Sequence, residues 1–499
     1  MASTVLPGYV LQTTLLAAGV GLGVMGLGTA CAAAVTLFEF PGRRVFEWAL
    51  LLPLAMPAYV LAYAWTDALQ FSSPLHTALR HGLGVTGPLW PDVRSLWGAV
   101  ILFVLCLYPY VYLLTRAALA ERGVQMMEAA RLLGAGMRRR VLQVALPLAR
   151  PAIAAGVALA LMETLADYGV GAYFGLSTFS TGIYKAWLVM NDRIAAAQLA
   201  SLLLLAVALL LAAERRAQRR LRFAGSRSTQ SSEARAVPLH GKAAWAAWLL
   251  CALPVGMGFV LPVAWLVRML WVEAAASDIG LPLARFVSWA LASLQLASLA
   301  ALAATLLALG LSVALRRSPS PGIGLLPVLA RVVSLGYAVP GAVIAVGILL
   351  PLAWAQQRWP QLGLGVWVTG TIFGLMYAYL VRFSAVALQS VEAGLARVPR
   401  SIDDTARMLG AAPQRVFMQL HLPLLRRSAL AAALLVFVDV MKELPATLVL
   451  RPFGSDTLAV VAYNLARDER LGEAALPSLA IVAVGLLPVV LLSGALRQK

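Results

Sequence analysis

Long hydrophobic runs alternate with short polar segments along the whole chain. A helix needs about 20 apolar residues to cross the hydrocarbon core of a bilayer, and many of these runs reach that length. Because every backbone polar group in lipid must be satisfied, such runs form helices. The pattern predicts eleven membrane-spanning helices, at residues 12–36, 46–66, 97–115, 148–170, 194–213, 245–270, 289–315, 326–352, 366–388, 426–449 and 475–495.

A basic, Ser-rich segment at residues 215–237 separates the predicted spans into two groups. It contains almost no aliphatic residues, which is typical of a flexible linker. We therefore predict a first transmembrane half at 1–214, a cytoplasmic linker at 215–242 and a second transmembrane half at 243–499. The first half has one span fewer than the second. We expect either that the natural start lies upstream or that this chain has lost a helix.

Composition excludes a soluble domain, because 61% of the residues are hydrophobic and only 12% are charged. Globular proteins carry about 25% charged residues. The net charge of +18 would suggest nucleic acid in a soluble protein. In a membrane protein, Lys and Arg gather in cytoplasmic loops, and a cytoplasmic linker puts most of them on that side. We therefore expect a multi-pass protein in a lipid bilayer, with no nucleic-acid partner.

Residues 128–150 and 404–426 are two copies of one segment, at a constant offset of 276. Eleven of the 23 aligned positions are identical, and the register continues into the following predicted span. Both copies have the same predicted orientation, with the repeated segment in the cytoplasm. The chain therefore contains a parallel repeat, whose pseudo-axis lies along the membrane normal.

Each copy predicts two short helices with a break between them, at Gly134 and at Gly410. Glycine allows a turn that other residues resist. Small residues precede the glycine, at Ala129, Ala130 and Ala406. They predict a low helix face that fits into a groove on another protein. A plain amphipathic helix lying on the membrane surface is disfavoured, since it explains no repetition at identical spacing.

Charged and proline residues refine this picture of the two copies. Glu128 and Asp404 are expected near a helix start, where a carboxylate is favoured. Pro147 and Pro423 are expected in the first turn of the next membrane helix. His421 lies in the second copy and is expected to face solvent or a partner protein.

This pattern resembles the EAA loop of ABC importer permeases: Glu-Ala-Ala, three residues, Gly, nine residues, an aliphatic residue, one residue, and Leu-Pro. Residues 128–147 match it in full, whereas residues 404–423 depart at Asp404 and Thr405. In that family the loop is the coupling helix that fits a cleft on the nucleotide-binding subunit. The resemblance implies an ATPase-coupling role for seven residues: Glu128, Ala129, Ala130, Gly134, Asp404, Ala406 and Gly410. We call residues 128–147 the first coupling loop and residues 404–423 the second coupling loop.

Most of the chain is similar to the fused, two-half permeases of ferric-iron importers, with supporting stretches at 40–67, 163–200 and 442–480. This resemblance implies an all-α polytopic fold of the type I ABC importer kind, with twelve helices in the family, in a bacterial inner membrane. It also implies alternating access, two copies of an ABC ATPase subunit and a periplasmic ferric-iron-binding protein. Permeases for thiamine, polyamines and phosphonates are relatives and remain alternatives. An ion-coupled secondary transporter is a remote alternative, since many of those have inverted repeats.

The sequence contains no Gly-x4-Gly-Lys-Ser/Thr phosphate loop. We therefore expect that the chain is not an enzyme and holds no cofactor. The resemblance implies that a separate ATPase subunit binds ATP and Mg²⁺.

Carboxylates inside predicted spans are costly and usually functional. Glu163 and Asp167 lie four residues apart, so one helix would place them on the same face. The repeat aligns them with Asp439 and Glu443. The two pairs are candidates to flank a pathway for a hard cation such as Fe(III). A structural or gating role stays open, because Lys442 adjoins Glu443.

Other candidate metal ligands form weaker patterns. Tyr168, Tyr173 and Tyr184 follow the first pair of carboxylates on the periplasmic side. A tyrosine oxygen is a possible ferric ligand, but tyrosines are also common at membrane interfaces. His76 and His81 lie five residues apart in a periplasmic loop. These patterns leave the identity of any metal-binding residues open.

Overall fold

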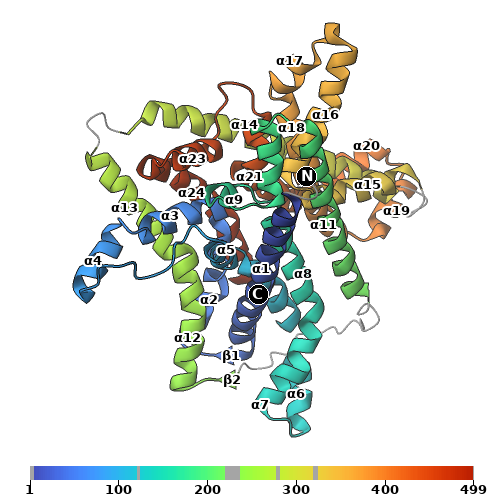
Figure 1. Ribbon diagram of the computed structural model, residues 1–499. Coiled ribbons are helices and arrows are strands. Elements are labelled where there is room, and N and C mark those ends of the chain that lie inside the picture. The colour runs from blue at the N-terminus through green and yellow to red at the C-terminus, as the bar shows by residue number, and fades with distance from the viewer. Residues whose placement is uncertain (1–4, 121–123, 220–236, 277–280, 318–323, 498–499) are drawn as a thin grey trace. The chain divides into compact units, whose positions relative to one another are not determined.

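The computed structural model describes residues 5–120, 124–219, 237–276, 281–317 and 324–497. Almost all regular structure in these residues is helical, which confirms the all-α class (Figure 1). The chain forms two compact units. One contains residues 1–281 and 462–499, and the other contains residues 282–461. The first unit therefore includes the beginning and the end of the predicted second half.

Most of the first unit comes from helices that precede the predicted linker. They are α1 (Leu6–Leu37), α2 (Arg43–Ala49), η1 (Leu52–Ala55), α3 (Ala58–Leu69), α4 (Pro74–Leu83), α5 (Leu96–Ala118), α6 (Val124–Leu132), α7 (Met137–Arg139), η3 (Arg140–Ala145), α8 (Leu146–Ala166), α9 (Gly169–Tyr173), α10 (Phe179–Tyr184), η4 (Lys185–Val189) and α11 (Arg193–Arg219). The other helices of this unit are α12 (Lys242–Val255), η6 (Gly256–Val260), α13 (Leu261–Ala276) and α24 (Leu471–Arg497). A short parallel pair joins β1 (Phe38–Glu39) to β2 (Val237–Pro238).

Helices α1, α5 and α8 pack closely in the first unit. Two glycines permit this approach, because a Cβ on either one would collide with α5. A Cβ on Gly28 would lie 2.8 Å from the Tyr108 carbonyl oxygen, and a Cβ on Gly156 would lie 2.6 Å from Val111 Cα. Small residues at such contacts are the usual means by which membrane helices approach one another.

Helices α13 and α24 pack against each other and against first-half elements. The Trp265 indole on α13 donates a hydrogen bond to the Asp67 carboxylate on α3 at 2.8 Å. A Cβ on Gly485 of α24 would lie 2.4 Å from the Ala55 carbonyl oxygen of η1. These contacts explain why two segments of the second half belong to the first unit.

The second unit contains a matching core, because α14, α18 and α21 pack together as α1, α5 and α8 do. Its elements are α14 (Leu283–Arg317), α15 (Leu325–Leu335), η7 (Gly336–Ala338), α16 (Gly341–Arg358), η8 (Pro360–Leu362), α17 (Leu364–Thr369), α18 (Phe373–Leu395), α19 (Arg400–Met408), α20 (Pro413–Val416), η9 (Phe417–His421), α21 (Leu422–Met441), α22 (Pro445–Leu450) and α23 (Leu458–Arg467), which continues into the first unit.

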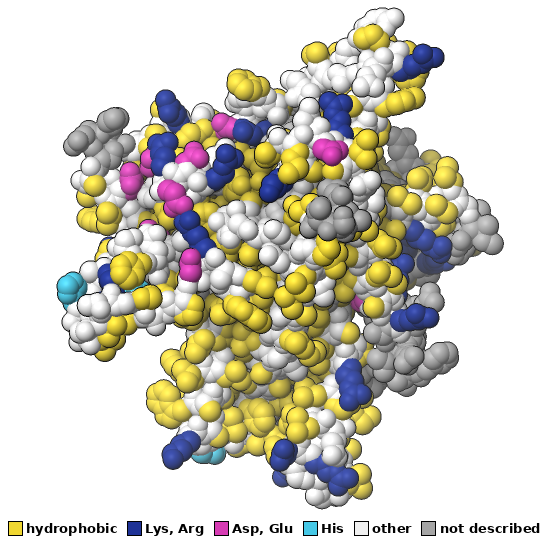
Figure 2. All heavy atoms as spheres, in the orientation of Figure 1, with side chains coloured by type: hydrophobic (Ala, Val, Ile, Leu, Met, Phe, Trp, Pro, Cys, Tyr) yellow, Lys and Arg dark blue, Asp and Glu magenta, His cyan; other side chains and the backbone are white. Residues whose placement is uncertain are grey.

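Seven helices in the described residues are long and apolar enough to cross a bilayer, or up to nine spans if each of two bent helix pairs is one span. Helices α18 and α21 coincide with predicted spans 366–388 and 426–449 but are not among these nine. They carry charged residues, including Arg382 and Asp439. All eleven predicted spans therefore contain helix. Figure 2 shows a broad hydrophobic surface over the first unit, as a lipid environment requires.

Predicted spans 46–66 and 326–352 are not single straight helices. Each bends at a break, by 91° in the first half and by 118° in the second. The second helix of each pair begins directly after Pro57 or Pro340, and the preceding residue, Met56 or Val339, is extended. Proline lacks a backbone donor and disfavours helical geometry in the residue before it. The prediction of continuous helices was wrong for this reason.

The predicted linker at 215–242 lies mostly outside the described residues. The two ends of the predicted linker that the structure describes have regular secondary structure. Helix α11 continues to Arg219, and Val237–Pro238 forms β2 against β1.

Candidate functional site

The two copies of the repeated segment adopt the same helix–turn–helix. Helix α6, a turn at Gly134 and helix α7 form the first copy, and α19, a turn at Gly410 and α20 form the second. The φ angle is +78° at Gly134 and +73° at Gly410. Residues with a side chain are strained in this left-handed region. The predicted glycine break is confirmed in both copies.

Side-chain and backbone contacts also recur at the 276-residue offset. The first copy has Gly134 N to Arg131 O at 2.9 Å, Ala135 N to Ala130 O at 3.0 Å, Arg139 Nε to Gln143 Oε1 at 2.9 Å, and an Arg131–Glu128 ion pair at 3.6 Å. The second copy has Gly410 N to Arg407 O at 2.9 Å, Ala411 N to Ala406 O at 3.0 Å, Arg415 Nε to Gln419 Oε1 at 2.9 Å, and an Arg407–Asp404 ion pair at 3.5 Å. The departure of the second copy from the EAA pattern therefore leaves the turn geometry unchanged.

Glu128 and Asp404 do not lie at a helix start, contrary to the sequence prediction. Helix α6 begins at Val124, and α19 begins at Arg400, directly after its N-cap residue Pro399. Both carboxylates therefore lie in the second turn. There they pair with an arginine three residues later, which is a favourable spacing on a helix surface.

The alanines of the two copies do not all lie on the exposed face. Ala129 is exposed, Ala130 is half-buried and Ala406 is buried. Only Ala129 is thus available on the outer surface of the helix.

A pair of large apolar side chains at each turn was missed by the sequence analysis. They are highly exposed, at 84% for Leu132, 88% for Leu133, 88% for Met408 and 82% for Leu409. The available signal was two adjacent apolar residues before the glycine in both copies. Exposed apolar pairs at one repeated position indicate a surface that contacts either another protein or lipid.

The segment after each turn leads directly into a membrane helix. Pro147 and Pro423 lie in the first turn of α8 and α21, as predicted. A π-helical segment, η3 or η9, precedes each of them. His421, at the end of η9, is buried and hydrogen-bonded to Asp403 at 2.7 Å. Its predicted exposure was wrong, because a buried carboxylate from α19 faces the imidazole.

Asp167 and Glu443 lie beyond the membrane helices that precede them, since α8 ends at Ala166 and α21 at Met441. The prediction that each pair of carboxylates shares one helix face was therefore wrong. Each carboxylate instead accepts hydrogen bonds from the start of the next short helix, as an N-terminal cap does. The bonds are Val170 N to Asp167 Oδ2 at 2.9 Å, Gly171 N to Asp167 Oδ2 at 3.4 Å, Ala446 N to Glu443 Oε1 at 2.9 Å and Thr447 N to Glu443 Oε2 at 3.0 Å.

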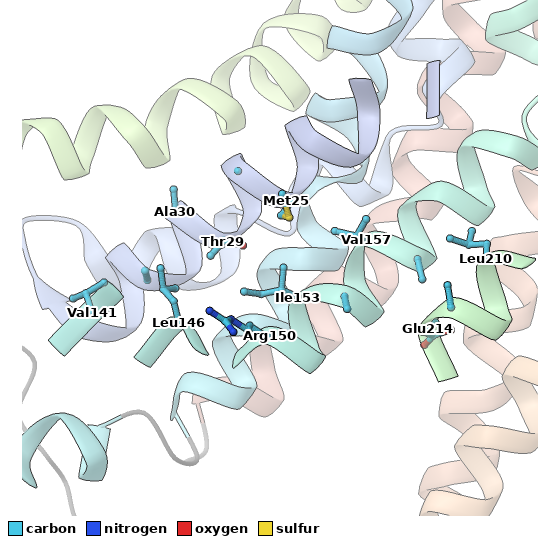
Figure 3. Close-up of a pocket in the computed structure, with 15 residues that line it drawn as sticks. Met25, Thr29, Ala30, Val141, Leu146, Arg150, Ile153, Val157, Leu210 and Glu214 are labelled. Carbon is cyan, nitrogen blue, oxygen red and sulfur yellow. The ribbon is translucent and has the colours of Figure 1, made fainter. Parts of the chain in front are cut away.

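The other two predicted carboxylates, Glu163 and Asp439, lie within α8 and α21 and are half-buried. Asp439 pairs with Lys442 at 3.0 Å. A cavity of about 820 Å³ lies between α1, α8 and α11 of the first unit (Figure 3). Its lining is mainly apolar, with Arg150 and Glu214 as the charged members, and includes none of the four predicted carboxylates.

The weaker metal candidates make contacts of other kinds. The Tyr463 hydroxyl donates to the Tyr168 hydroxyl at 3.2 Å, and the Tyr168 ring lies 3.9 Å from that of Tyr184. The His76 ring accepts a hydrogen bond from Leu89 N at 3.2 Å. Within the described part of the chain, no group of three or more His, Cys, Asp or Glu side chains is placed to hold a metal ion.

An ion pair outside the membrane helices joins distant parts of the first unit. Both carboxylate oxygens of Glu469 accept hydrogen bonds from Arg94, at 2.8 and 3.0 Å, and Arg94 also donates to the Tyr173 hydroxyl at 3.1 Å. The hydrogen bonds from Arg94 lower the pKa of the Glu469 carboxyl below its ordinary value of 4.5. A lowered pKa stabilises the fold above pH 4.5, and this stabilisation is lost as the pH falls through the lowered value.

Replacement of Glu469 by Gln is therefore expected to destabilise the protein at pH 7 by at most about 1 kcal/mol, since the pair is partly exposed. Thermal unfolding measured from pH 7 downward checks this. The difference between Glu469→Gln and the wild type should shrink below pH 4.5, while the exposed neighbour variant Asp468→Asn should show little effect. A difference that stays constant with pH would contradict the role of the ion pair.

The same family model matches both halves of the chain. Residues 24–223 and 306–499 match the family described as "Binding-protein-dependent transport system inner membrane component". The chain is 26% identical to the Fe(3+)-transport system permease protein FbpB 2 of Haemophilus influenzae, over 96% of this chain and 88% of that protein. It is 30% identical to the putative 2-aminoethylphosphonate transport system permease protein PhnV of Salmonella typhimurium, over 40% of this chain and 70% of that protein.

A solved structure is similar to part of the chain. It is the crystal structure of a bacterial alginate ABC transporter in complex with an alginate pentasaccharide-bound periplasmic protein. The TM-score is 0.39 at 15% identity, and the match covers 50% of this chain and 94% of that chain.

Proposed function

Because the chain belongs to the family of binding-protein-dependent transport inner-membrane components, we propose that it is the fused, two-half permease of an ATP-driven importer for ferric iron. The similarity to an Fe(3+)-transport permease over 96% of the chain supports this cargo. In this proposal the permease lies in the bacterial inner membrane. A periplasmic binding protein delivers the iron to it.

The observation that carries the coupling role is the identical geometry of the two coupling loops. Each ends its first helix in a left-handed glycine and exposes two large apolar side chains there. We propose that Leu132–Leu133 and Met408–Leu409 enter a cleft on each of two copies of an ATPase subunit. ATP and Mg²⁺ bind to those subunits, so the permease chain itself needs no cofactor and is not an enzyme.

The connection of the loops to the membrane helices supports alternating access. Helices α8 and α21 follow the coupling loops without a break in the chain. A movement of either loop on ATP binding therefore passes into a helix that carries a half-buried carboxylate, Glu163 or Asp439. We propose that these two oxygen-bearing side chains contact the cation in passage, since Fe(III) prefers hard ligands. Asp167 and Glu443 would act on the pathway by holding the helix breaks beside it.

Uptake by proteoliposomes tests the cargo. Vesicles that contain the permease and its ATPase subunits, supplied with radiolabelled ferric iron on the periplasmic binding protein, are expected to accumulate iron only when ATP is present. 2-Aminoethylphosphonate is the second candidate, because PhnV is similar to 40% of the chain. ATP-dependent accumulation of that compound without iron would reject the ferric assignment and leave the importer class intact.

A further inference from the structure

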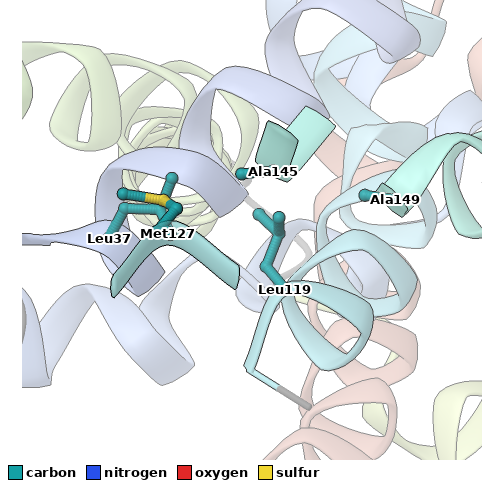
Figure 4. Close-up of a cluster of buried hydrophobic side chains, with 5 residues drawn as sticks. All are labelled: Leu37, Leu119, Met127, Ala145 and Ala149. Carbon is teal, nitrogen blue, oxygen red and sulfur yellow. The ribbon is translucent and has the colours of Figure 1, made fainter. Parts of the chain in front are cut away.

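The buried sides of the two coupling loops differ, although their exposed sides match. Under the first loop, five apolar side chains meet: Leu37, Leu119, Met127, Ala145 and Ala149 (Figure 4). Leu37 is the last residue of α1, and Leu119 directly follows α5. Met127 lies in α6 just before the first coupling loop, Ala145 lies in the loop, and Ala149 lies in α8. Apolar packing therefore joins the first loop to the membrane helices.

The second loop keeps only part of this apolar cluster. At the 276-residue offset, Leu395 and Leu425 retain apolar side chains in place of Leu119 and Ala149. Asp403 stands in place of Met127, and His421 stands in place of Ala145. Both polar residues are buried. Arg316, in the last turn of α14, supplies a third polar side chain, of which 8% is exposed.

These three side chains form one hydrogen-bonded network. Arg316 Nε donates to Asp403 Oδ2 at 2.5 Å, and His421 Nε2 lies 2.7 Å from Asp403 Oδ1. Arg316 also donates to the carbonyl oxygens of Leu395 and Pro399, each at 2.9 Å. A single guanidinium therefore joins the end of α18, the residue before α19, and the Asp403 carboxylate within α19.

The next residue, Arg317, forms a similar contact with the other short helix, α20. Arg317 donates a hydrogen bond to the carbonyl oxygen of Pro413, at the start of α20. The last turn of α14 thus holds both short helices of the second loop. In the first half, the positions 276 residues before Arg316 and Arg317 are Phe40 and Pro41, which carry no charge.

The charge on Asp403 is stable at neutral pH. Burial disfavours the carboxylate, but hydrogen bonds with His421 and Arg316 outweigh burial and lower its pKa below the ordinary value of 3.8. Removing one member of a buried ionic network leaves an uncompensated charge, whereas replacing all members by apolar residues of similar size is often tolerated. The first loop of the same chain has apolar residues, Met127 and Ala145, at the positions of Asp403 and His421.

We propose that Arg316, Asp403 and His421 are positioning residues that hold the second coupling loop in the orientation required for ATPase docking. Their hydrogen bonds and ion pair fix the orientation of the second loop, whereas apolar packing fixes the orientation of the first loop. This inference rests on the proposed coupling function. The three residues lie beneath the second loop and are separate from the exposed pair Met408 and Leu409.

Binding of the purified ATPase subunit to the full-length permease in nanodiscs tests the proposal without any cargo. Asp403→Asn is expected to raise the ATPase concentration needed for half-maximal binding at least about tenfold, with an unchanged maximal signal at saturation. The matched control is Asp404→Asn, an exposed neighbour whose arginine pair lies at the surface. It should stay within about twofold of the wild type.

A triple variant, Arg316→Leu with Asp403→Met and His421→Ala, replaces the network by apolar side chains, and Met and Ala are the residues that the first half carries at the positions of Asp403 and His421. It is expected to bind the ATPase within about threefold of the wild type. Equal binding by Asp403→Asn and the wild type would overturn the proposal. If Asp403→Asn cannot be purified, Arg316→Met takes its place: binding weakened at least about tenfold supports the proposal, and binding equal to that of the wild type overturns it. Absence of ATPase binding by the wild type would instead reject the proposed coupling function.

Discussion

Substituting valine for both Gly134 and Gly410 is expected to lower ATP-driven uptake at least about tenfold while the permease still inserts into the membrane. Both glycines have positive φ angles, where a side chain costs roughly 1–2 kcal/mol per residue. About 1.4 kcal/mol corresponds to a tenfold change in binding. No atom lies within 4 Å of a Cβ at either position, so the strain changes the turn without disturbing other packing.

Gly136→Ala provides the matched control for this double variant. Gly136 lies two residues beyond the first turn, has a φ of −65° and also has open space around it. The second loop carries Ala412 at the equivalent position. Uptake by Gly136→Ala should equal that of the wild type, with the amount of permease in the membrane measured for each variant. Normal uptake by the valine double variant would show that the glycine turns are not needed for coupling.

The features that the sequence predicted well depend on local chemistry repeated in two places. Hydrophobic length alone located helix in every predicted span. The glycine turns were predictable because no other residue type adopts that backbone geometry as readily. Repetition then distinguished a functional loop from an ordinary surface helix, since chance does not reproduce a glycine and a Leu-Pro pair at one offset.

The features that the sequence did not predict depend on contacts between distant residues. Burial of His421 requires Asp403 from another helix and Arg316 from α14, and hydropathy along the chain contains no information on such encounters. The membership of α13 and α24 in the first unit likewise follows from packing between residues far apart in the sequence, such as Trp265 and Asp67, which are separated by 198 positions. The helix breaks at Asp167 and Glu443 were missed although each has a local signal, because Gly169 and Pro445 are the first residues of the helices that follow.

Glu443 has a different environment from Asp167, although the repeat aligns them. Glu443 is buried, and its Oε1 lies 3.8 Å from Nη1 of Arg382, which is also buried within α18. Cys106 occupies the position 276 residues before Arg382, so the first half carries no arginine at the aligned position. Asp167 is half-buried and caps α9. In the second half, Glu443 both caps a helix and forms a buried ion pair with Arg382. In the first half, Asp167 caps a helix, and no arginine stands at the aligned position.

Replacing Glu443 by Gln is consequently expected to destabilise the permease by roughly 3–5 kcal/mol, because Arg382 keeps its charge in a buried site. Asp167→Asn, the repeat-related control, should cost only about 1 kcal/mol, the usual effect of weakening a helix cap. Combining Glu443→Gln with Arg382→Met should recover most of the lost stability, since both members of the ion pair are then replaced by uncharged side chains. Thermal unfolding of the purified variants measures all three effects, with iron uptake recorded in parallel. Lost uptake by Glu443→Gln at an unchanged unfolding temperature would contradict the structural role and identify Glu443 as a contact for the transported cation.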